Sequence, residues 1–218
     1  MRKNIFFCLL FCTSLFANSG ATFGGLTGMF NIPLASVLLN NEQLVSLHKY
    51  QITYAYGMFN VLELGVRTSV EQVTTFEELG RNFQFNFKIK ALDQKKCFVD
   101  LAGGGENTDY FLCLSKTINA LGNLDIALGI GNGRFHGFFG GLAFQLDPIT
   151  QFGLEYDGTD FNAGIRLVIS PKMKFDLYFK GINMMLDRVY LKDIINNHIV
   201  FGISYTENLM FDLGGIFR

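Results

Sequence analysis

The chain has 218 residues and a formal net charge of −1, so its overall charge gives no reason to expect nucleic acid or an anionic surface as a partner. It is rich in apolar residues: 49% are hydrophobic, 24 are phenylalanine and only 17% are charged. Beyond the N-terminal leader described next, no stretch reaches the roughly 18 uninterrupted apolar residues that a membrane-spanning helix requires.

The N-terminus has the layout of a secretory signal peptide. Arg2 and Lys3 form a basic start, an apolar run of about a dozen residues follows, and Ala17 is a small residue suited to cleavage. This run is too short to cross a bilayer as a helix. We therefore predict export, with a signal peptide over residues 1–17. The mature chain of about 200 residues is enough for one domain.

Polar and apolar residues alternate along most of the mature chain. The stretch from Asn82 to Lys90 alternates without exception, which gives a β-strand one polar face and one apolar face. The same pattern recurs between turn-forming residues and predicts about twelve strands, with no convincing helix among them. In chain order the predicted strands are Leu44–Tyr56, Phe59–Ser69, Asn82–Leu92, Cys97–Gly105, Asp109–Ile118, Asn123–Asn132, His136–Leu146, Thr150–Asp157, Asp160–Ser170, Met173–Ile182, His198–Thr206 and Asn208–Phe217.

An exported, apolar-rich domain built from two-faced strands fits an all-β fold, an antiparallel up-and-down transmembrane β-barrel of about 12 strands. We assign residues 44–218 to the barrel and residues 18–43 to an N-terminal lead-in that could fold into or cap the barrel mouth. The alternative is a soluble sandwich or lipocalin-like barrel, in which the apolar faces point inward. Residue size favours the membrane, because the polar faces carry small residues such as Gly153 and Gly164, whereas the apolar faces carry Phe, Leu and Ile.

The first predicted strand contains an irregularity that affects the strand count. Its alternation changes phase near His48 and Lys49. A β-bulge explains the change with one inserted residue, whereas a tight hairpin would add a strand. With the bulge, the long connections at residues 70–81 and 183–197 fall at the end of the barrel that carries the N-terminus, although outer-membrane barrels usually have their long loops at the outer end.

The late hairpins give a strand register from the pattern of faces. A two-residue turn at Gly158 and Thr159 and the turn at Pro171 together set Arg166 opposite Asp176 on the polar face. We predict that these two residues form a structural charge pair in the lumen. The other charged residues predicted to face the lumen are Glu63, Arg67, Lys88, Asp125, Glu155, Asp157, Lys174 and Lys180. We interpret these charges as neutralising one another and filling a narrow barrel, because no ring of one sign indicates a binding or conducting role.

No residue pattern indicates catalysis, a cofactor or a metal. Ser46 and His48 would share one face of a strand, but a lone pair of this kind is usually incidental. The histidines are scattered and lack the cysteine support of a metal site. Cys97 and Cys113 lie on neighbouring predicted strands, but their phases point the thiols to opposite faces. We therefore expect two small core or wall residues rather than a disulfide.

The stretch after the predicted signal peptide resembles the opening of a known family. It reads Gly24-Gly25-Leu26-Thr27-Gly28-Met29-Phe30-Asn31-Ile32-Pro33-Leu34-Ala35. It is similar to the YjbH-like exopolysaccharide-associated outer-membrane proteins, which typically begin with Gly-Leu-x-Gly leading to Pro-x-Ala. Further matches in the family's order include Glu155-Tyr156-Asp157-Gly158 and Asn162-Ala163-Gly164-Ile165-Arg166. The resemblance runs from about Gly24 to Lys180.

This resemblance implies an outer-membrane β-barrel linked to exopolysaccharide production or export in a Gram-negative bacterium. The implied partners are outer-membrane lipids and exopolysaccharide or its export machinery. The family supplies no catalytic residues, so we expect a structural or accessory role rather than an enzyme. A small-solute pore and a secreted soluble lipid-binding barrel are the alternatives.

Overall fold

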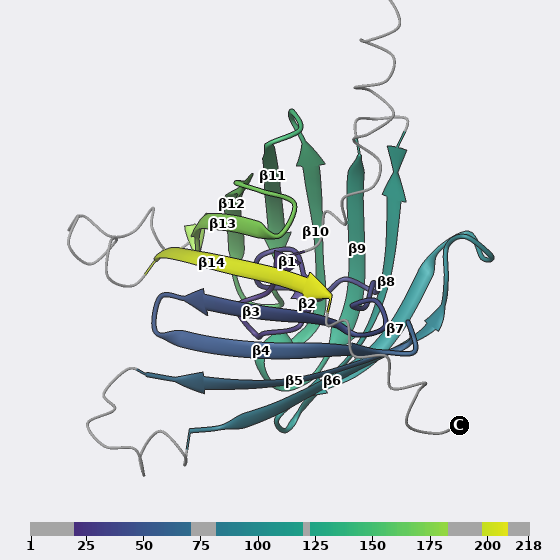
Figure 1. Cartoon of the computed structure of the whole chain (residues 1–218). Helices are drawn as coiled ribbons and strands as arrows, with labels where there is room; N and C mark the ends of the chain where they lie inside the picture. The colour runs from purple at the N-terminus through teal and green to yellow at the C-terminus, as the bar shows by residue number, and fades with distance from the viewer. Residues whose placement is uncertain (1–19, 71–81, 120–122, 183–197, 209–218) are drawn as a thin grey trace, which may run out of the picture.

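The computed structural model describes residues 20–70, 82–119, 123–182 and 198–208, so the predicted signal peptide lies outside the described residues. In the described chain, twelve strands follow one another in sequence order around a closed barrel, and β14 pairs with β3 to close it (Figure 1). Every pairing in the barrel is antiparallel. The predicted antiparallel up-and-down β-barrel is therefore confirmed. No helix in the described residues is long and apolar enough to cross a membrane.

The barrel strands are short and are joined mostly by tight turns. They are β3 (Glu42–His48), β4 (Gln51–Met58), β5 (Leu62–Ser69), β6 (Gln84–Leu92), β7 (Asp100–Glu106), β8 (Asp109–Ile118), β9 (Leu124–Gly131), β10 (Gly137–Gln145), β11 (Thr150–Tyr156), β12 (Phe161–Val168), β13 (Met173–Phe179) and β14 (Ile199–Asn208). A short 3-10 helix, η3 (Gly133–Phe135), joins β9 and β10. Two further strands, β1 (Gly20–Ala21) and β2 (Thr27–Gly28), form a separate small sheet.

The first predicted strand, Leu44–Tyr56, is wrong, because the structure has two strands there. β3 ends at His48 and β4 begins at Gln51, and these two residues face each other across a two-residue turn. Such a turn flips the phase of the alternation, just as a bulge does. Lys49 has a φ of 50°, in the left-handed region that glycine and asparagine usually occupy. The sequence therefore carries no residue that marks this turn.

The barrel of the described residues still has twelve strands, because β3 and β4 replace one predicted strand and β14 is the last strand of the ring. β14 closes the barrel against β3, and the last predicted strand, Asn208–Phe217, lies outside the described residues beyond Asn208. The predicted strand Cys97–Gly105 is shifted, since β7 begins at Asp100 and Cys97 belongs to the preceding turn.

The added hairpin changes which connections lie at which end of the barrel. We call the end where β3 begins at Glu42 and β14 ends at Asn208 the terminal end, and the other the opposite end. β5 and β13 finish at the opposite end, at Ser69 and Phe179, as the strand directions in Figure 1 show. The long connections thus start at the end of the barrel opposite to the start of β3. Their predicted placement is wrong because the turn at Lys49 reverses the direction of every later strand.

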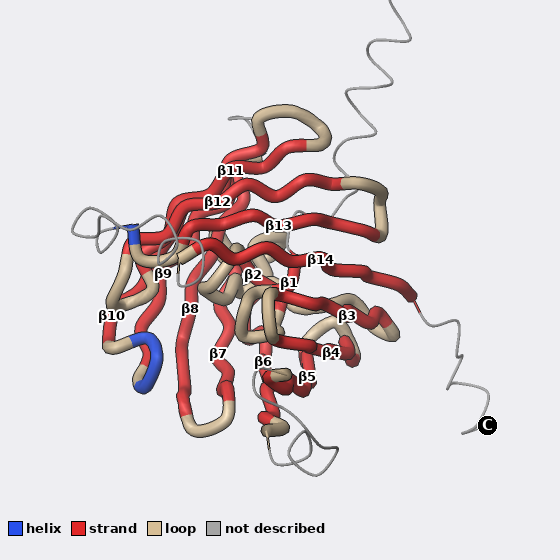
Figure 2. Tube along the Cα trace, turned by 90° about the vertical axis from the view of Figure 1, so that its left-hand side faces the viewer, coloured by secondary structure: helices blue, strands red, loops and turns tan. Residues whose placement is uncertain are grey.

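Each barrel strand has an apolar outer face and a mainly polar inner face. On β6, Phe85 is 74% exposed, whereas its neighbour Asn86 is 3% exposed. Figure 2 shows the strands as a ring with β1 and β2 inside it. The arrangement is the reverse of a lipocalin-like barrel, whose apolar faces point inward.

Candidate functional site

The lumen of the barrel is occupied by the N-terminal segment, residues 20–38, which we call the plug. In both views β1, β2 and the loops beside them lie within the ring of strands (Figures 1 and 2). The plug folds back on itself through the β1–β2 pair and a bridge between Gly28 and Pro33. It continues into β3 at the terminal end, where the N–H of Asn40 donates to the side chain of Asn60 (2.8 Å).

A buried ion pair in the barrel wall holds the middle of the plug. Glu63 on β5 and Lys88 on β6 lie 3.3 Å apart, and both are fully buried. Glu63 accepts the N–H and the hydroxyl of Thr27, each at 2.7 Å, and the N–H of Leu38 at 3.2 Å. Lys88 donates to the Thr27 carbonyl at 2.7 Å and to its hydroxyl. The pair therefore satisfies backbone groups of the plug that would otherwise be buried without partners.

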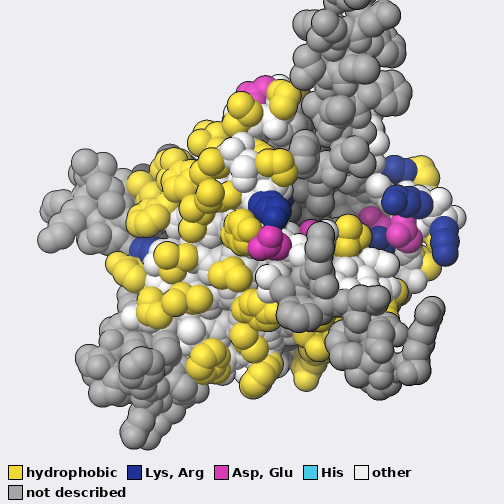
Figure 3. Space-filling view, viewed as in Figure 1, with side chains coloured by type: hydrophobic (Ala, Val, Ile, Leu, Met, Phe, Trp, Pro, Cys, Tyr) yellow, Lys and Arg dark blue, Asp and Glu magenta, His cyan; other side chains and the backbone are white. Residues whose placement is uncertain are grey.

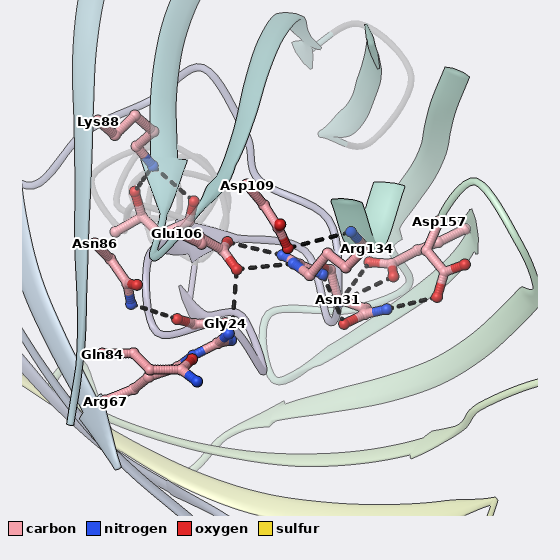
Figure 4. Close-up of polar contacts among 12 residues, drawn as sticks. Gly24, Asn31, Arg67, Gln84, Asn86, Lys88, Glu106, Asp109, Arg134 and Asp157 are labelled. Atoms are coloured by element: carbon pink, nitrogen blue, oxygen red, sulfur yellow. Dashed lines mark hydrogen bonds and ion pairs between the residues drawn. The ribbon is translucent and has the colours of Figure 1, made fainter. Parts of the chain in front are cut away.

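Side chains from neighbouring parts of the wall bind the tip of the plug. Glu155 on β11 accepts the backbone N–H of Phe30 (2.6 Å) and of Asn31 (2.9 Å). The Asn31 side chain donates to Asp157 in the β11–β12 turn (2.6 Å). The backbone carbonyl of Asn31 accepts from Arg134 of η3 (2.9 Å), as Figure 4 shows. Two consecutive plug residues are thus held by β11, the turn after it and η3.

Arg166 joins the wall to the plug from the side of β12. It faces Asp176 on β13, which is the register predicted from the turns. Its Nε and Nη2 lie 2.7 and 3.0 Å from the two carboxylate oxygens. The guanidinium also donates to the carbonyls of Ala21, Gly28 and Met29 at 2.6–3.3 Å. The buried Arg166 guanidinium therefore donates hydrogen bonds to one carboxylate and to three backbone carbonyls of the plug.

A further polar group lies at the opposite end of the lumen (Figure 4). Glu106 on β7 accepts from Arg134 through both carboxylate oxygens, at 2.7 and 2.8 Å, and Arg67 lies 3.5 Å away. Nearby, Asn86 donates to the carbonyl of Gly24 in the plug (2.6 Å). Wall side chains thus bind the plug along its length, from Gly24 to Leu38.

Glycines in the wall make room for the large side chains of the plug. A Cβ at Gly153 would lie 2.4 Å from the ring of Phe30, and one at Gly164 would lie 3.1 Å from it. A Cβ at Gly141 would lie 3.0 Å from the side chain of Ile32. The close approach of the plug therefore explains part of the small inner face, whereas Gly129 and Gly202 make room for the wall side chains of Phe139 and His48.

The predicted lumen charges differ in what they contact. Those that contact the plug are Glu63, Lys88, Glu155, Asp157 and Arg166. Arg67 and Asp176 contact other wall side chains, and Asp125 accepts from neighbouring hydroxyl and amide groups at 2.6 and 3.3 Å. Lys174 is buried near the terminal end, and Lys180 lies half-buried just beyond β13. Mutual neutralisation accordingly describes only part of the lumen, because half of these charges also bind the plug.

Ser46, His48 and Asp176 form a buried chain of polar contacts. The Ser46 hydroxyl lies 3.2 Å from His48 Nδ1, and His48 Nε2 lies 3.3 Å from Asp176. However, Ser46 is only 2% exposed and also lies 2.5 Å from the hydroxyl of Thr53. A serine nucleophile has to reach a substrate. The geometry instead favours a supporting role, in which His48 helps to hold the carboxylate that binds Arg166.

The sequence reasoning missed the plug residues that contact the wall, above all Thr27, Phe30 and Asn31. Two signals point to them in retrospect: the stretch before β3 lacks strand alternation, and the glycine-rich inner face needs something bulky to pack against. Cys97 and Cys113 are free thiols. The described residues contain no group of three or more His, Cys, Asp or Glu that could hold a metal. The chain matches no family model, and no curated protein matches it.

Proposed function

We propose that this protein is an outer-membrane β-barrel, closed by its own N-terminal plug, with a structural or accessory role in exopolysaccharide production or export. The observation that carries the membrane location is the outer surface. Large apolar side chains are exposed on almost all barrel strands, and Figure 3 shows them spread widely over the strands. Such a surface is unfavourable in water and suits contact with acyl chains.

The distribution of aromatic residues supports the same location. Most exposed aromatic side chains lie toward the two ends of the strands, where aromatic girdles meet the two membrane interfaces. Those toward the opposite end are Tyr50, Phe83, Phe85, Tyr110, Phe138, Phe161, Phe179 and Phe201, and those toward the terminal end are Phe59, Phe98, Phe144, Phe152 and Tyr205. Between them the exposed residues are mainly aliphatic, such as Leu128 and Leu154.

The plug favours a structural role over a small-solute pore. An open channel would leave charged wall residues in contact with water, whereas Glu63, Lys88 and Arg166 are at most 1% exposed. Because their charged groups bind plug backbone, displacing the plug would break several charge-assisted hydrogen bonds at once. We therefore place conduction second, as a function that requires movement of the plug.

The link to exopolysaccharide is supported by the resemblance alone. The segment that carries it most clearly, Gly24 to Ala35, is the central part of the plug. The opening stretch of the resemblance therefore lies in the lumen, whereas later stretches such as Asn162 to Arg166 lie in the barrel wall. This location fits a role in which the plugged lumen, and not the outer face, is the functional feature.

One experiment tests the membrane location and a second tests the biological role. The mature chain should fractionate with the outer membrane and change its gel mobility on boiling. Recovery as a soluble monomer without detergent would contradict the proposal. In the source bacterium, deletion of the gene should lower the amount of secreted exopolysaccharide, and a plasmid copy should restore it. An unchanged amount would remove the accessory role but leave the membrane location standing.

A further inference from the structure

The turn between β6 and β7, residues 93–99, forms an ordered platform at the terminal end. The Asp93 carbonyl accepts the N–H of Lys96 (2.9 Å) and of Cys97 (2.8 Å), and its carboxylate accepts the N–H of Lys95 (2.8 Å). In Figure 1 this hairpin projects at the right-hand side of the barrel. Figure 3 shows Lys and Arg side chains gathered there.

The acidic groups of this turn are already engaged. Lys90 lies 3.0 Å from Asp93 and 3.1 Å from Asp100. Asp100 also accepts the N–H of Gln94 (2.7 Å). Both carboxylates are thus taken up by one lysine and by backbone N–H groups of the turn.

Three other lysines close to the turn form no ion pair within 4.0 Å among the described residues, although Lys95 interacts electrostatically with Asp93. They are Lys95, Lys96 and Lys116. The end of β8 is tied to the turn, because the N–H of Thr117 donates to the side chain of Gln94 (3.0 Å). This bond and the contact of Lys116 with Phe98 bring the end of β8 to the turn, so the three lysines lie on adjoining segments of the terminal end, which we call the basic patch.

The basic patch lies where the apolar outer surface ends. On β8 the outward residues Leu112 and Leu114 are exposed and apolar, and Lys116 follows them in the same phase. The Lys116 ammonium lies over the ring of Phe98, which is 80% exposed. An exposed aromatic ring beside lysines at the border of an apolar belt matches the chemistry of a lipid interface, where rings and alkyl stems contact acyl chains and ammonium groups reach phosphates.

We propose that the basic patch, together with the neighbouring Phe98, binds the phosphate headgroup of an anionic phospholipid in the leaflet at the terminal end. The inference rests on the membrane location proposed above. Charge complementarity carries it, since each lysine close to an anionic membrane surface contributes favourably. The same turn uses its own carboxylates elsewhere, so the three ammonium groups are left for an external anion.

The test uses the full chain purified in detergent and mixed with equal amounts of phosphatidylglycerol and phosphatidylcholine of matched acyl chains. Native mass spectrometry measures the ratio of the two bound lipids. The unaltered chain should retain phosphatidylglycerol preferentially, and each lysine-to-glutamine change should lower that preference by about fivefold. The triple change of Lys95→Gln, Lys96→Gln and Lys116→Gln should abolish it. The matched control is Lys172→Gln, a terminal-end lysine already paired with Glu207 at 2.6 Å, which should keep the preference.

The possible results separate the two proposals. If the unaltered chain is recovered as a soluble monomer without detergent, the membrane location is wrong. If it inserts but shows no preference for phosphatidylglycerol, or if the triple variant keeps the preference, the basic patch is not a lipid site. Competition by millimolar inorganic phosphate would identify a site for free phosphate and overturn the lipid assignment. An unchanged boiling-dependent gel shift shows that the triple variant is folded.

Discussion

At the scale of single residues, the lumen shows how charges can be buried inside a barrel. A buried charge needs both an opposite charge and hydrogen-bond partners. Arg166 obtains the first from Asp176 and the second from carbonyls of the plug. Glu63 and Lys88 follow the same logic around Thr27. Fixing the plug and neutralising the wall are therefore done by the same side chains.

The Arg166–Asp176 pair is expected to matter for stability. Asp176→Ala leaves a buried guanidinium without its carboxylate, which should lower the free energy of unfolding by about 3–5 kcal/mol. Adding Arg166→Ala should restore part of the loss but not all of it, because the plug carbonyls then lose their donor. Urea unfolding of the detergent-solubilised protein measures both variants. Lys172→Gln, in an exposed pair, is the control and should cost at most about 1 kcal/mol. Strictly additive effects would show that Arg166 and Asp176 are not coupled.

Asp157 should make the attachment of the plug tip sensitive to acid. Burial acts to raise its pKa, but the N–H of Asp160, the side chain of Asn162 and the N–H of Thr159 together hold the pKa below its ordinary value of 3.8. Because the folded pKa lies below the unfolded one, the carboxylate stabilises the fold above about pH 4. That contribution is lost as the pH falls through the folded pKa.

The Asp157 variant checks this dependence directly. Asp157→Asn should lower the midpoint of thermal unfolding at pH 7 and reduce the further decrease between pH 5 and pH 2, as followed by circular dichroism. A variant whose midpoint falls as steeply with acid as that of the unaltered chain would assign the acid sensitivity to another group.

At the scale of elements, the plug and the wall glycines form one packing unit. Gly153→Ala places a methyl group against the ring of Phe30, so we expect a loss of about 1–3 kcal/mol. Gly103→Ala on the outer face of β7 is the matched control, since the nearest atom to its new Cβ would be 3.6 Å away. Combining Gly153→Ala with Phe30→Leu should recover part of the stability. Equal losses of stability for the two glycine variants would mean that contact with the plug is not what destabilises Gly153→Ala.

Removal of the plug should convert the barrel into a channel. A chain lacking residues 20–38 exposes the polar inner face, so it should conduct ions in a planar bilayer where the full chain is silent. Addition of a synthetic peptide of residues 20–38 should reduce the current, because the wall groups that bind the plug remain in place. The boiling-dependent gel shift confirms that the shortened chain is folded. Equal currents from the full and the shortened chain would contradict closure by the plug.

At the scale of the whole molecule, the two faces of the barrel meet different surroundings. A nitroxide label at Phe85 or Phe87 should report lipid, because these side chains are exposed on the outer face. A cysteine in place of Gln84 or Asn86 should face the polar interior. Asn86 is covered by the plug. A cysteine that replaces Asn86 should therefore react with a water-soluble thiol reagent only after removal of the plug. Lipid contact at Asn86 together with water contact at Phe85 would show that the inner and outer faces of the barrel are assigned the wrong way round.

The sequence by itself determined the strands, their faces and most of the register. Side chains of a strand alternate with a period of two, so the outward Phe85 and the inward Asn86 can be read from neighbouring letters. The turns at Gly158 and Pro171 carry residues that mark them, and they place Arg166 opposite Asp176 correctly. The turn at Lys49 carries no such mark and gives the same change of phase as a bulge, so only the structure distinguished the two.

Tertiary structure alone decided which contacts hold the plug in the lumen. The N–H of Phe30 binds Glu155, which lies 125 residues later in the chain. No local pattern encodes that contact, because it exists only once the barrel has closed and has brought β5, β6, β11 and β12 around one segment. The alternation of a strand is a property of the local backbone and is readable from sequence. The pairing of a buried charge with a distant backbone depends on closure of the whole ring.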